Sequence, residues 1–305
     1  MPRAAIYRRY GDSSVLEIED IETPQPGPGM VRVRVTRSSV NPVDSKMRAG
    51  LLSGGAPLEE PAVAGMDVAG IVDAVGEGAD TLSVGDRVAG LSPNGAAAEY
   101  IVTYAAALVR IPDGVSDAVA STIGVGGSTA VRALGEAGVG EGSVILVDGA
   151  AGGVGTFLTQ LAVAAGATVI GTASPKNHDG LRERGVIPVD YSGDWQGAVR
   201  EAADGRAIDA AFDLVTAGKY DAFSELVTEG GAIVTLLDPE VAERGGIIIT
   251  GMEDGYDSAL QRVIDGVAAG DILVPIEDVL PLERIAEAQD RSAAGHVRGK
   301  LVLAI

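Results

Sequence analysis

The distribution of hydrophobic and polar residues divides the chain into two parts with different patterns. From Arg3 to about Pro112, short segments with alternating apolar and polar positions are separated by glycine and proline turns. Val31–Val40 opens with strict alternation of apolar and charged residues, which is the period of a half-buried strand. The preceding run Pro24–Gly29 excludes a helix or a central strand and predicts a connection. We therefore expect this part to be β-rich with few helices.

From about Asp117 to Gly266 the pattern becomes a repeat of strand, glycine turn and helix. The segment Val154–Ala165 is predicted to be a helix. The expected strands are Val144–Asp148, Thr168–Thr172, Val186–Val189, Ala210–Leu214 and Ala232–Leu236. Repeated strand–helix units imply a parallel sheet that is covered by helices on both faces.

The end of the chain returns to β structure. Helices are expected over Asp257–Ala269 and Leu282–Ala293, and a final strand is expected over Lys300–Ala304. We therefore predict an α/β protein in which a nucleotide-binding domain, residues 119–266, is inserted into a β-rich domain formed by residues 1–118 and 267–305.

Composition narrows the possible chemistry. The 305 residues carry a formal net charge of −20, and a field of that sign repels nucleic acid and anionic membrane surfaces. The absence of cysteine and the presence of two histidines exclude disulfides, thiolate nucleophiles and cysteine- or histidine-rich metal sites. We therefore predict a protein without metal. Neither a signal peptide nor an apolar run long enough to cross a bilayer is expected, so we also predict a cytoplasmic protein.

A glycine-rich turn, Gly149–Gly155 (GAAGGVG), follows a predicted buried strand and opens a predicted helix. In the G-x-G-x-x-G pattern of dinucleotide-binding turns, Ala150 stands in the place of the first glycine. Small residues let the backbone approach a pyrophosphate, and the N-terminus of the helix offers unpaired N–H groups. A tight turn without a ligand is the alternative, but the flanking strand and helix favour dinucleotide binding.

The end of the second strand indicates which dinucleotide is bound. An NAD site normally has a carboxylate there, which holds the ribose 2′-hydroxyl, but after Thr172 this chain has no acid before Asp179. Ser174 and Lys176 offer a hydroxyl and a cation for a 2′-phosphate instead, although a lysine at the start of a helix is often only solvated. We therefore expect NADP(H).

These motifs and several shorter ones resemble the medium-chain dehydrogenase/reductase superfamily, and within it the zinc-independent quinone oxidoreductases and related enoyl reductases. The resemblance extends over essentially the whole chain and rests on the order and spacing of its markers. They are Asn41–Asp44 (NPVD), Gly65–Gly70 (GMDVAG) with Val75 and Gly76, Gly85–Val88 (GDRV), Ala98–Tyr100 with Ile111 and Pro112, Ala150–Gly155, and Gly299–Leu303 (GKLVL).

The resemblance implies a GroES-like β-rich catalytic domain and a Rossmann domain with a doubly wound parallel sheet. It also implies a protein without zinc. Zinc-dependent members have a cysteine where this chain has Asn41 and a Gly-His-Glu where it has Gly65–Asp67, and their third ligand falls near Val125. The implied reaction is NADPH-dependent transfer of hydride to a quinone or an activated C=C, and the implied assembly is a homodimer.

The resemblance also assigns cofactor contacts position by position. Asn41 is expected near the nicotinamide ribose and Thr129 near the nicotinamide. Ser174, Lys176 and Tyr191 match positions that hold the 2′-phosphate in NADPH-dependent relatives, and a half-buried Tyr191 that only closes a strand end is the alternative. The remaining implied contacts are Gly152, Gly153 and Val154 at the pyrophosphate, Leu236 and Leu237 at the nicotinamide, and Lys300 from the C-terminal strand.

The proton donor is the point at which this chain departs from the family. Many enoyl reductases have a tyrosine shortly after the segment that matches Met47–Gly50, where this chain has Leu51 and Leu52. Leucine cannot donate a proton, so water or another group such as Asp44, Lys46 or Asp67 is left as the donor, unless the substrate needs none. Asp44 is equally well explained as a structural residue that satisfies loop amides.

The developing oxyanion needs hydrogen-bond donors, and Asn41, Lys46 and backbone amides are the candidates. A protein of the same fold that binds NADPH without redox turnover, as a sensor or as a cofactor-assisted cyclase or isomerase, is the alternative function. A short-chain reductase is disfavoured, because no tyrosine is followed by a lysine four residues later. A methyltransferase shares the glycine turn but normally has an acid at the end of the second strand.

The partners are predicted from two apolar segments. The loop Gly50–Pro61 is apolar with glycine and serine, which favours a small uncharged or hydrophobic substrate. The run Ile247–Thr250 (IIIT) is expected at a sheet edge, where it would be poorly protected unless a second copy covers it. We therefore expect the homodimer to form near this edge.

Overall fold

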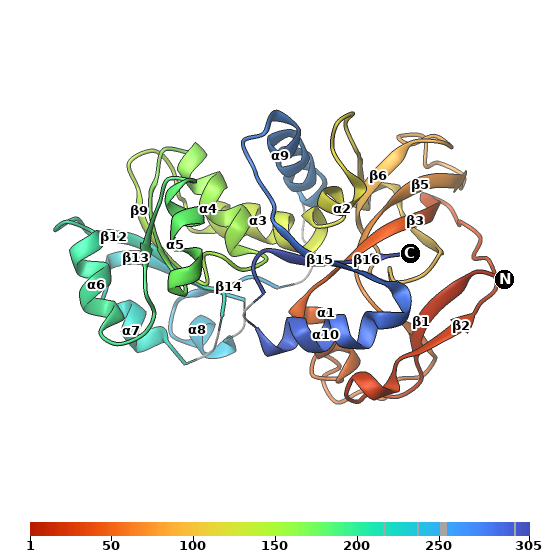
Figure 1. Ribbon diagram of the computed structural model, residues 1–305, viewed down its shortest axis with the longest axis horizontal. Helices are drawn as coiled ribbons and strands as arrows, with labels where there is room; N and C mark the ends of the chain where they lie inside the picture. Colours follow the sequence, from red (N-terminus) through yellow and green to blue (C-terminus); the bar gives the residue numbers. More distant parts are fainter. Residues whose placement is uncertain (216–217, 237, 251–254, 296) are drawn as a thin grey trace. The chain divides into compact units, whose positions relative to one another are not determined.

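The computed structural model describes residues 1–215, 218–236, 238–250, 255–295 and 297–305. The chain divides into two compact units, each with its own sheet structure (Figure 1). Unit 1 comprises Met1–Gly126, Gly255–Ala269 and Val274–Ile305, and unit 2 comprises Gly127–Asp254 and Gly270–Leu273. No helix among the described residues has the length and apolar character needed to cross a membrane.

Unit 2 is built on a six-stranded sheet with the order β11-β10-β9-β12-β13-β14. All of its strand pairs are parallel, and the order is that of a doubly wound dinucleotide-binding sheet. The predicted parallel sheet is thus confirmed. The strands are β9 (Val144–Asp148), β10 (Thr168–Thr172), β11 (Val186–Val189), β12 (Ile208–Asp213), β13 (Val227–Thr235) and β14 (Ile247–Ile248).

Helices cover both faces of this sheet. Buried residues of β9, β10, β11, β12 and β13 form one core with residues from three helices, α6 (Trp195–Ala202), α7 (Tyr220–Ser224) and α8 (Pro239–Glu243). Helix α4 (Gly155–Ala164) packs on β9 and β10 but contributes nothing to that core, so it covers the opposite face. The remaining helices of the unit are α3 (Ser128–Glu136), which packs on α4, α5 (His178–Arg182) and the 3-10 turn η4 (Pro175–Asn177).

Unit 1 is β-rich, as predicted. A three-stranded sheet has the order β2-β1-β4, and a seven-stranded sheet has the order β15-β16-β3-β5-β6-β8, with β7 paired to β3. The alternation in β3 is confirmed, because Val31, Val33 and Val35 are all buried. The strands are β1 (Arg3–Tyr7), β2 (Glu17–Asp20), β3 (Met30–Val40), β4 (Ala62–Val63), β5 (Asp67–Val75), β6 (Arg87–Leu91), β7 (Tyr100–Tyr104), β8 (Leu108–Arg110), β15 (Ile276–Pro281) and β16 (Lys300–Ala304).

Short helices close the ends of these strands. Helix α1 (Pro42–Arg48) follows β3 directly and packs on α10 (Ile285–Ala294), with which it lies side by side in Figure 1. A π-helical turn, η3 (Ile123–Gly127), carries the chain out of unit 1 into unit 2. The others are α2 (Asp117–Ala120), α9 (Tyr256–Ala269), η1 (Ser13–Val15), η2 (Ala105–Ala107) and η5 (Leu282–Arg284).

The pairing of β3 with its neighbours determines what meets at its end. β16 runs antiparallel to β3 with Leu301 opposite Val40, so Lys300 lies beside the residue that follows the strand, Asn41. On the other side, β5 runs antiparallel with Ala69 opposite Arg37, which brings Asp67 to the level of Ser39. Side chains from three strands therefore converge where β3 passes into α1.

Candidate active site

The glycine turn between β9 and α4 has the features of an anion-binding loop. Within the described chain, the backbone N–H groups of Ala151, Gly153 and Val154 donate no hydrogen bond, and these residues are half-buried at the start of α4. A Cβ on Gly155 would come within 2.2 Å of the Gly149 carbonyl oxygen, so the turn closes only with glycine there. Unused N–H groups at the N-terminus of a helix suit a pyrophosphate.

Ala150 and Gly152 hold the turn in shape rather than presenting donors. The N–H of Ala150 donates to the carbonyl of Thr172 at 3.1 Å, and the N–H of Gly152 donates to the carbonyl of Gly149 at 3.0 Å. The candidate anion-binding atoms therefore come from the residues between and after these two.

A buried carboxylate lies just before the turn and is neutralised by a lysine. Asp148 is 4% exposed, and its Oδ2 accepts from Lys219 Nζ at 2.6 Å while its Oδ1 accepts from the Thr172 hydroxyl. A bare carboxylate at this position would oppose a bound phosphate, and Lys219 removes that charge. Sequence reasoning missed this pair, although the acid that ends the apolar strand VILVD was a visible signal.

The candidate 2′-phosphate residues lie just after the carboxyl ends of β10 and β11. β10 and β11 are parallel with Thr172 opposite Val189, so Ser174 and Lys176 leave one strand beside the point where Tyr191 leaves the next. Lys176 is exposed, and Tyr191 is 48% exposed. Asp190, which sequence reasoning did not consider, accepts from the N–H of Ser192 at 2.9 Å, and this bond lowers the pKa of its carboxyl.

Thr129 and Leu236 also belong to unit 2. Thr129 is half-buried in the first turn of α3, and Leu236 is half-buried directly after β13, with its N–H 3.4 Å from the carbonyl of Asp213. Leu237 lies outside the described residues.

Asn41 lies at the centre of a buried polar cluster in unit 1. Its Oδ1 accepts from Lys300 Nζ at 2.5 Å, and its Nδ2 donates to Asp67 Oδ2 at 2.9 Å. Lys300 Nζ is 3.6 Å from the same carboxylate oxygen. All three residues are at most 3% exposed, so Lys300, which was expected to reach the cofactor, has its ammonium bound to Asn41.

Asp67 links this cluster to two further segments. Its Oδ1 accepts from the N–H of Val125 in the π-helical turn at 2.6 Å, and its Oδ2 also accepts from the Ser39 hydroxyl. Of the positions at which the resemblance placed zinc ligands in other members, Asn41 and Val125 are thus joined here through the carboxylate of Asp67.

Asp44 is placed by Asn41 as well. Its Oδ2 accepts from the N–H of Asn41 at 2.8 Å, while its Oδ1 is buried without a hydrogen-bond partner among the described residues. Burial raises the pKa of this carboxyl to about 7, and the nearby Asp67 adds to the shift. Burial also lowers the pKa of Lys46, which is half-buried on the same helix.

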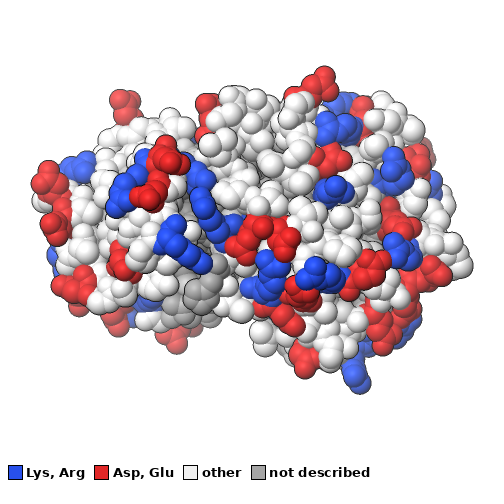
Figure 2. Space-filling view, viewed as in Figure 1, with Lys and Arg blue, Asp and Glu red and all other residues white. Residues whose placement is uncertain are grey.

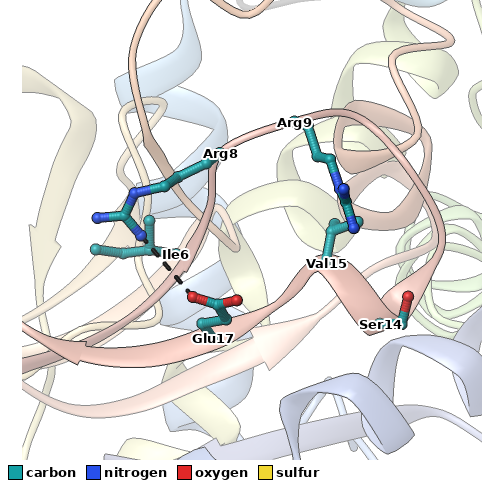
Figure 3. Close-up of a pocket in the computed structure, with 6 residues that line it drawn as sticks. All are labelled: Ile6, Arg8, Arg9, Ser14, Val15 and Glu17. Carbon is teal, nitrogen blue, oxygen red and sulfur yellow. Dashed lines mark ion pairs between the residues drawn. The ribbon is translucent and has the colours of Figure 1, made fainter.

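Charge and surface shape add little to this picture. On the face shown in Figure 2, the described lysine and arginine side chains are interspersed with acidic ones. An open pocket of about 270 Å³ lies in unit 1 and is lined by residues of β1, η1 and β2 and of the link between β1 and η1 (Figure 3). None of the predicted site residues lines it, and its Arg8 is paired with Glu19 and lies 4.0 Å from Glu17.

Two family models match the chain. Residues 27–113 match the alcohol dehydrogenase GroES-like domain, and residues 185–303 match the model described as zinc-binding dehydrogenase. These matches agree with the β-rich architecture of unit 1 and the parallel sheet of unit 2.

Curated relatives include much longer synthases and a quinone oxidoreductase of similar length. The chain is 32% identical over 97% of its length to a mycocerosic acid synthase-like polyketide synthase of Mycobacterium tuberculosis, and 33% identical over 93% of its length to an erythronolide synthase of Saccharopolyspora erythraea. It spans 15% and 8% of the lengths of those two proteins. It is also 31% identical to a quinone oxidoreductase of Pseudomonas aeruginosa, with 99% of each chain covered.

Solved structures with the same fold are described with different dinucleotides, one as an NADPH complex and one as NAD-dependent. A mycobacterial protein complexed with NADPH has a TM-score of 0.87 at 29% identity, with 100% of both chains covered. An NAD-dependent alcohol dehydrogenase has a TM-score of 0.88 at 30% identity, with 99% of both chains covered. Together with the glycine turn, the family indicates a nicotinamide cofactor. The identity to the quinone oxidoreductase extends along nearly the whole of both chains. This chain therefore belongs to the quinone oxidoreductase branch of the medium-chain dehydrogenase/reductase superfamily and is an oxidoreductase.

Proposed function

We propose that the chain is a zinc-free, NADPH-dependent reductase that transfers hydride to a quinone or to an activated C=C of a small, uncharged or hydrophobic substrate. The observation that carries the proposal is the set of groups at the carboxyl ends of β9 and β10 in unit 2. There the unused N–H groups of the glycine turn adjoin a strand end that has Ser174 and Lys176 and no acid before Asp179. This donor set suits a pyrophosphate and a 2′-phosphate.

In this proposal unit 2 is the nucleotide-binding domain and unit 1 is the catalytic domain. The N–H groups of Ala151, Gly153 and Val154 hold the pyrophosphate, and Ser174, Lys176 and Tyr191 hold the 2′-phosphate. By the resemblance, Thr129, Leu236 and Leu237 line the nicotinamide, and Asn41 lies at its ribose. The dinucleotide, when bound, supplies the hydride. The contribution of the chain is to bind, to orient and to exclude water.

The proposed absence of zinc rests on the donors present. Asn41 and Asp67 are already bound to Lys300 or to one another, Val125 offers only its backbone, and Met66 is a weak ligand for Zn²⁺. Among the described residues no group of three or more histidine, cysteine, aspartate or glutamate side chains is arranged to hold a metal ion. The oxyanion that develops on the substrate is left to N–H donors. Lys46 is the proposed side chain, because Asn41 lies at the nicotinamide ribose in this proposal and has a single free N–H.

The proton donor is proposed from the acid whose pKa lies near neutral pH. The pKa of Asp44 is raised to about 7 by burial, whereas Leu52 is 58% exposed and has no proton to give. Asp44 and Lys46 therefore remain the side-chain candidates, with water as the other source. A homodimer through the edge strand β14 is part of the same proposal.

The test is fluorescence titration with NADPH and with NADH on the wild type, on Lys176→Ala and on Arg182→Ala. Lys176→Ala should weaken NADPH binding about tenfold or more, because a charge-assisted contact to phosphate is lost, and should leave NADH binding nearly unchanged. Arg182→Ala removes the same charge from the neighbouring helix α5, where Arg182 pairs with Asp179, and should alter neither.

If Lys176→Ala weakened the binding of NADPH and of NADH equally, the assignment of Lys176 to the 2′-phosphate would be contradicted. Binding of neither dinucleotide by the wild type would remove the reductase proposal itself. Tight NADPH binding without NADPH consumption against a panel of quinones and enones would favour a non-redox role of the same fold.

A further inference from the structure

The orientation of the Asn41 carboxamide is determined by chemistry as well as by packing. An ammonium only donates and an ionised carboxylate only accepts. With Lys300 Nζ at 2.5 Å and Asp67 Oδ2 at 2.9 Å, the oxygen of the amide must face the lysine and its nitrogen must face the aspartate. A reversed amide would place like atoms against both partners.

The partners of Asn41 are themselves held from several elements. Lys300 is anchored by the pairing of β16 with β3, and Asp67 accepts from Val125 in the π-helical turn and from Ser39. A Cβ on Gly124 would come within 2.4 Å of Asp67 Oδ1, so the backbone of that turn lies close against the carboxylate. Neither neighbour of Asn41 can follow a rotation of its amide.

One hydrogen of the amide is left over by this arrangement. Asn41 Nδ2 has two hydrogens, and Asp67 takes one of them. The other has no partner among the described residues. The ammonium of Lys300 at Oδ1 withdraws electron density from the amide nitrogen, so this fixed N–H is a prepared donor for a ligand oxygen.

We infer that Lys300 is a positioning residue, which acts on the dinucleotide through Asn41 by fixing its amide so that the free N–H faces an oxygen of the bound cofactor. The inference rests on the proposed function, in which Asn41 lies at the nicotinamide ribose. In it Lys300 makes no cofactor contact of its own, which distinguishes it from a phosphate-binding lysine.

A double-mutant cycle on dinucleotide binding tests this inference. Lys300→Met and Asn41→Ala should each weaken NADPH binding about tenfold, and the double variant should bind about as weakly as Asn41→Ala alone, because Lys300 has no route to the cofactor without Asn41. If Lys300→Met still weakens binding about tenfold in the Asn41→Ala background, the lysine contacts the cofactor directly and the inference is wrong. If Lys300→Met leaves binding unchanged in the wild-type background, the inference is also wrong.

Lys300→Met leaves the buried carboxylate of Asp67 without its cation, so a second variant guards against misfolding. Lys300→Met combined with Asp67→Asn removes both charges, and thermal unfolding should show that it folds. With Val125 donating to the new amide oxygen, the NH2 group of residue 67 faces Asn41, whose amide must then reverse. NADPH binding should therefore stay weakened about tenfold although the fold is restored, and restored binding would overturn the inference.

The wild-type titration separates this inference from the function on which it rests. If the wild type binds neither NADPH nor NADH, the proposed function falls and this inference falls with it. If the wild type binds tightly while the cycle is additive, only the role of Lys300 is wrong.

Discussion

At the scale of single residues, Asp44 is the group whose ionisation the fold opposes most clearly. Its carboxyl is 4% exposed, and the charged or titratable groups near it are Asp67, Lys300 and Tyr7. Burial raises its pKa from 3.8 to about 7. The folded state therefore binds this proton more tightly than the unfolded state does, so the contribution of Asp44 to stability is greatest below about pH 4 and is lost as pH rises towards 7.

This asymmetry predicts a pH-dependent effect of Asp44→Asn. The asparagine can still accept from the N–H of Asn41 but cannot ionise. Between pH 5 and pH 8, the free energy of unfolding of the variant relative to the wild type should rise by about 2–3 kcal/mol, since one pKa unit corresponds to about 1.36 kcal/mol. Urea unfolding at the two pH values measures the change.

Asp86→Asn is the matched control for that measurement. A hydrogen bond from the N–H of Ser83 lowers the pKa of Asp86, so its contribution is already complete above its ordinary value and is lost only at lower pH. Its effect should therefore be the same at pH 5 and pH 8. Equal shifts for the Asp44 and Asp86 variants would show that Asp44 is ionised in the folded protein near pH 5.

The individual residues of the candidate site were only partly predictable. Asn41 and Lys300 were singled out from the motifs NPVD and GKLVL, but each was assigned to the cofactor separately. Their contact depends on β16 lying next to β3 with Leu301 opposite Val40, a pairing between residues far apart in the sequence. The Asp148–Lys219 pair was missed for the same reason, since it joins the end of β9 to the segment after β12.

At the scale of elements, short apolar strands were the most predictable. β9, β10, β11 and β16 have the expected bounds, because a short apolar run between turn residues leaves few alternatives. Helix α1 was not foreseen, because seven residues that follow Asn41 and begin with a proline resemble a loop more than an amphipathic helix. Helix α5 ends at Arg182, because the N–H of Arg184 then bonds to the carbonyl of Leu181 and Gly185 takes a φ of +77°.

Two helical glycines of unit 2 predict opposite effects of the same substitution. In Gly155→Ala the new Cβ would clash with the carbonyl oxygen of Gly149 at 2.2 Å, and this backbone atom can move only if the turn moves. The substitution should destabilise the protein by about 1–3 kcal/mol. Gly135→Ala, in the exposed part of α3, meets nothing within 4 Å and should stabilise it by about 0.5–1 kcal/mol through helix propensity.

Urea unfolding of both variants checks these signs, and NADPH titration adds a second reading. Gly155→Ala should also weaken NADPH binding, because the N–H groups of Ala151, Gly153 and Val154 depend on the shape of the turn, while Gly135→Ala should bind normally. A Gly155→Ala variant as stable as the wild type would mean that the turn is looser than its geometry indicates.

At the scale of the whole molecule, the net charge of −20 acts against the proposed cofactor. The basic groups that favour a phosphate are local, such as Lys176, whereas the acidic excess is spread over the chain and basic and acidic side chains are interspersed on the face in Figure 2. A local contact works over a few ångströms. The field of the whole charge extends about 30 Å at 0.01 M ionic strength and about 8 Å at 0.15 M.

This difference in range predicts that salt accelerates NADPH association. Raising ionic strength from about 0.01 M to about 0.15 M screens the long-range repulsion of the anionic dinucleotide more than it weakens the contacts made at the glycine turn, so the association rate should rise several-fold. NADPH carries one phosphate more than NADH, so the gain in its association rate should be the larger of the two.

Stopped-flow fluorescence with each dinucleotide measures both rates, and an uncharged quencher of protein fluorescence serves as the control whose rate should not respond to salt. A rate that falls with salt would mean that a positive field around Lys176 extends far enough to guide the ligand in, and that the acidic excess is directed away from the cofactor path.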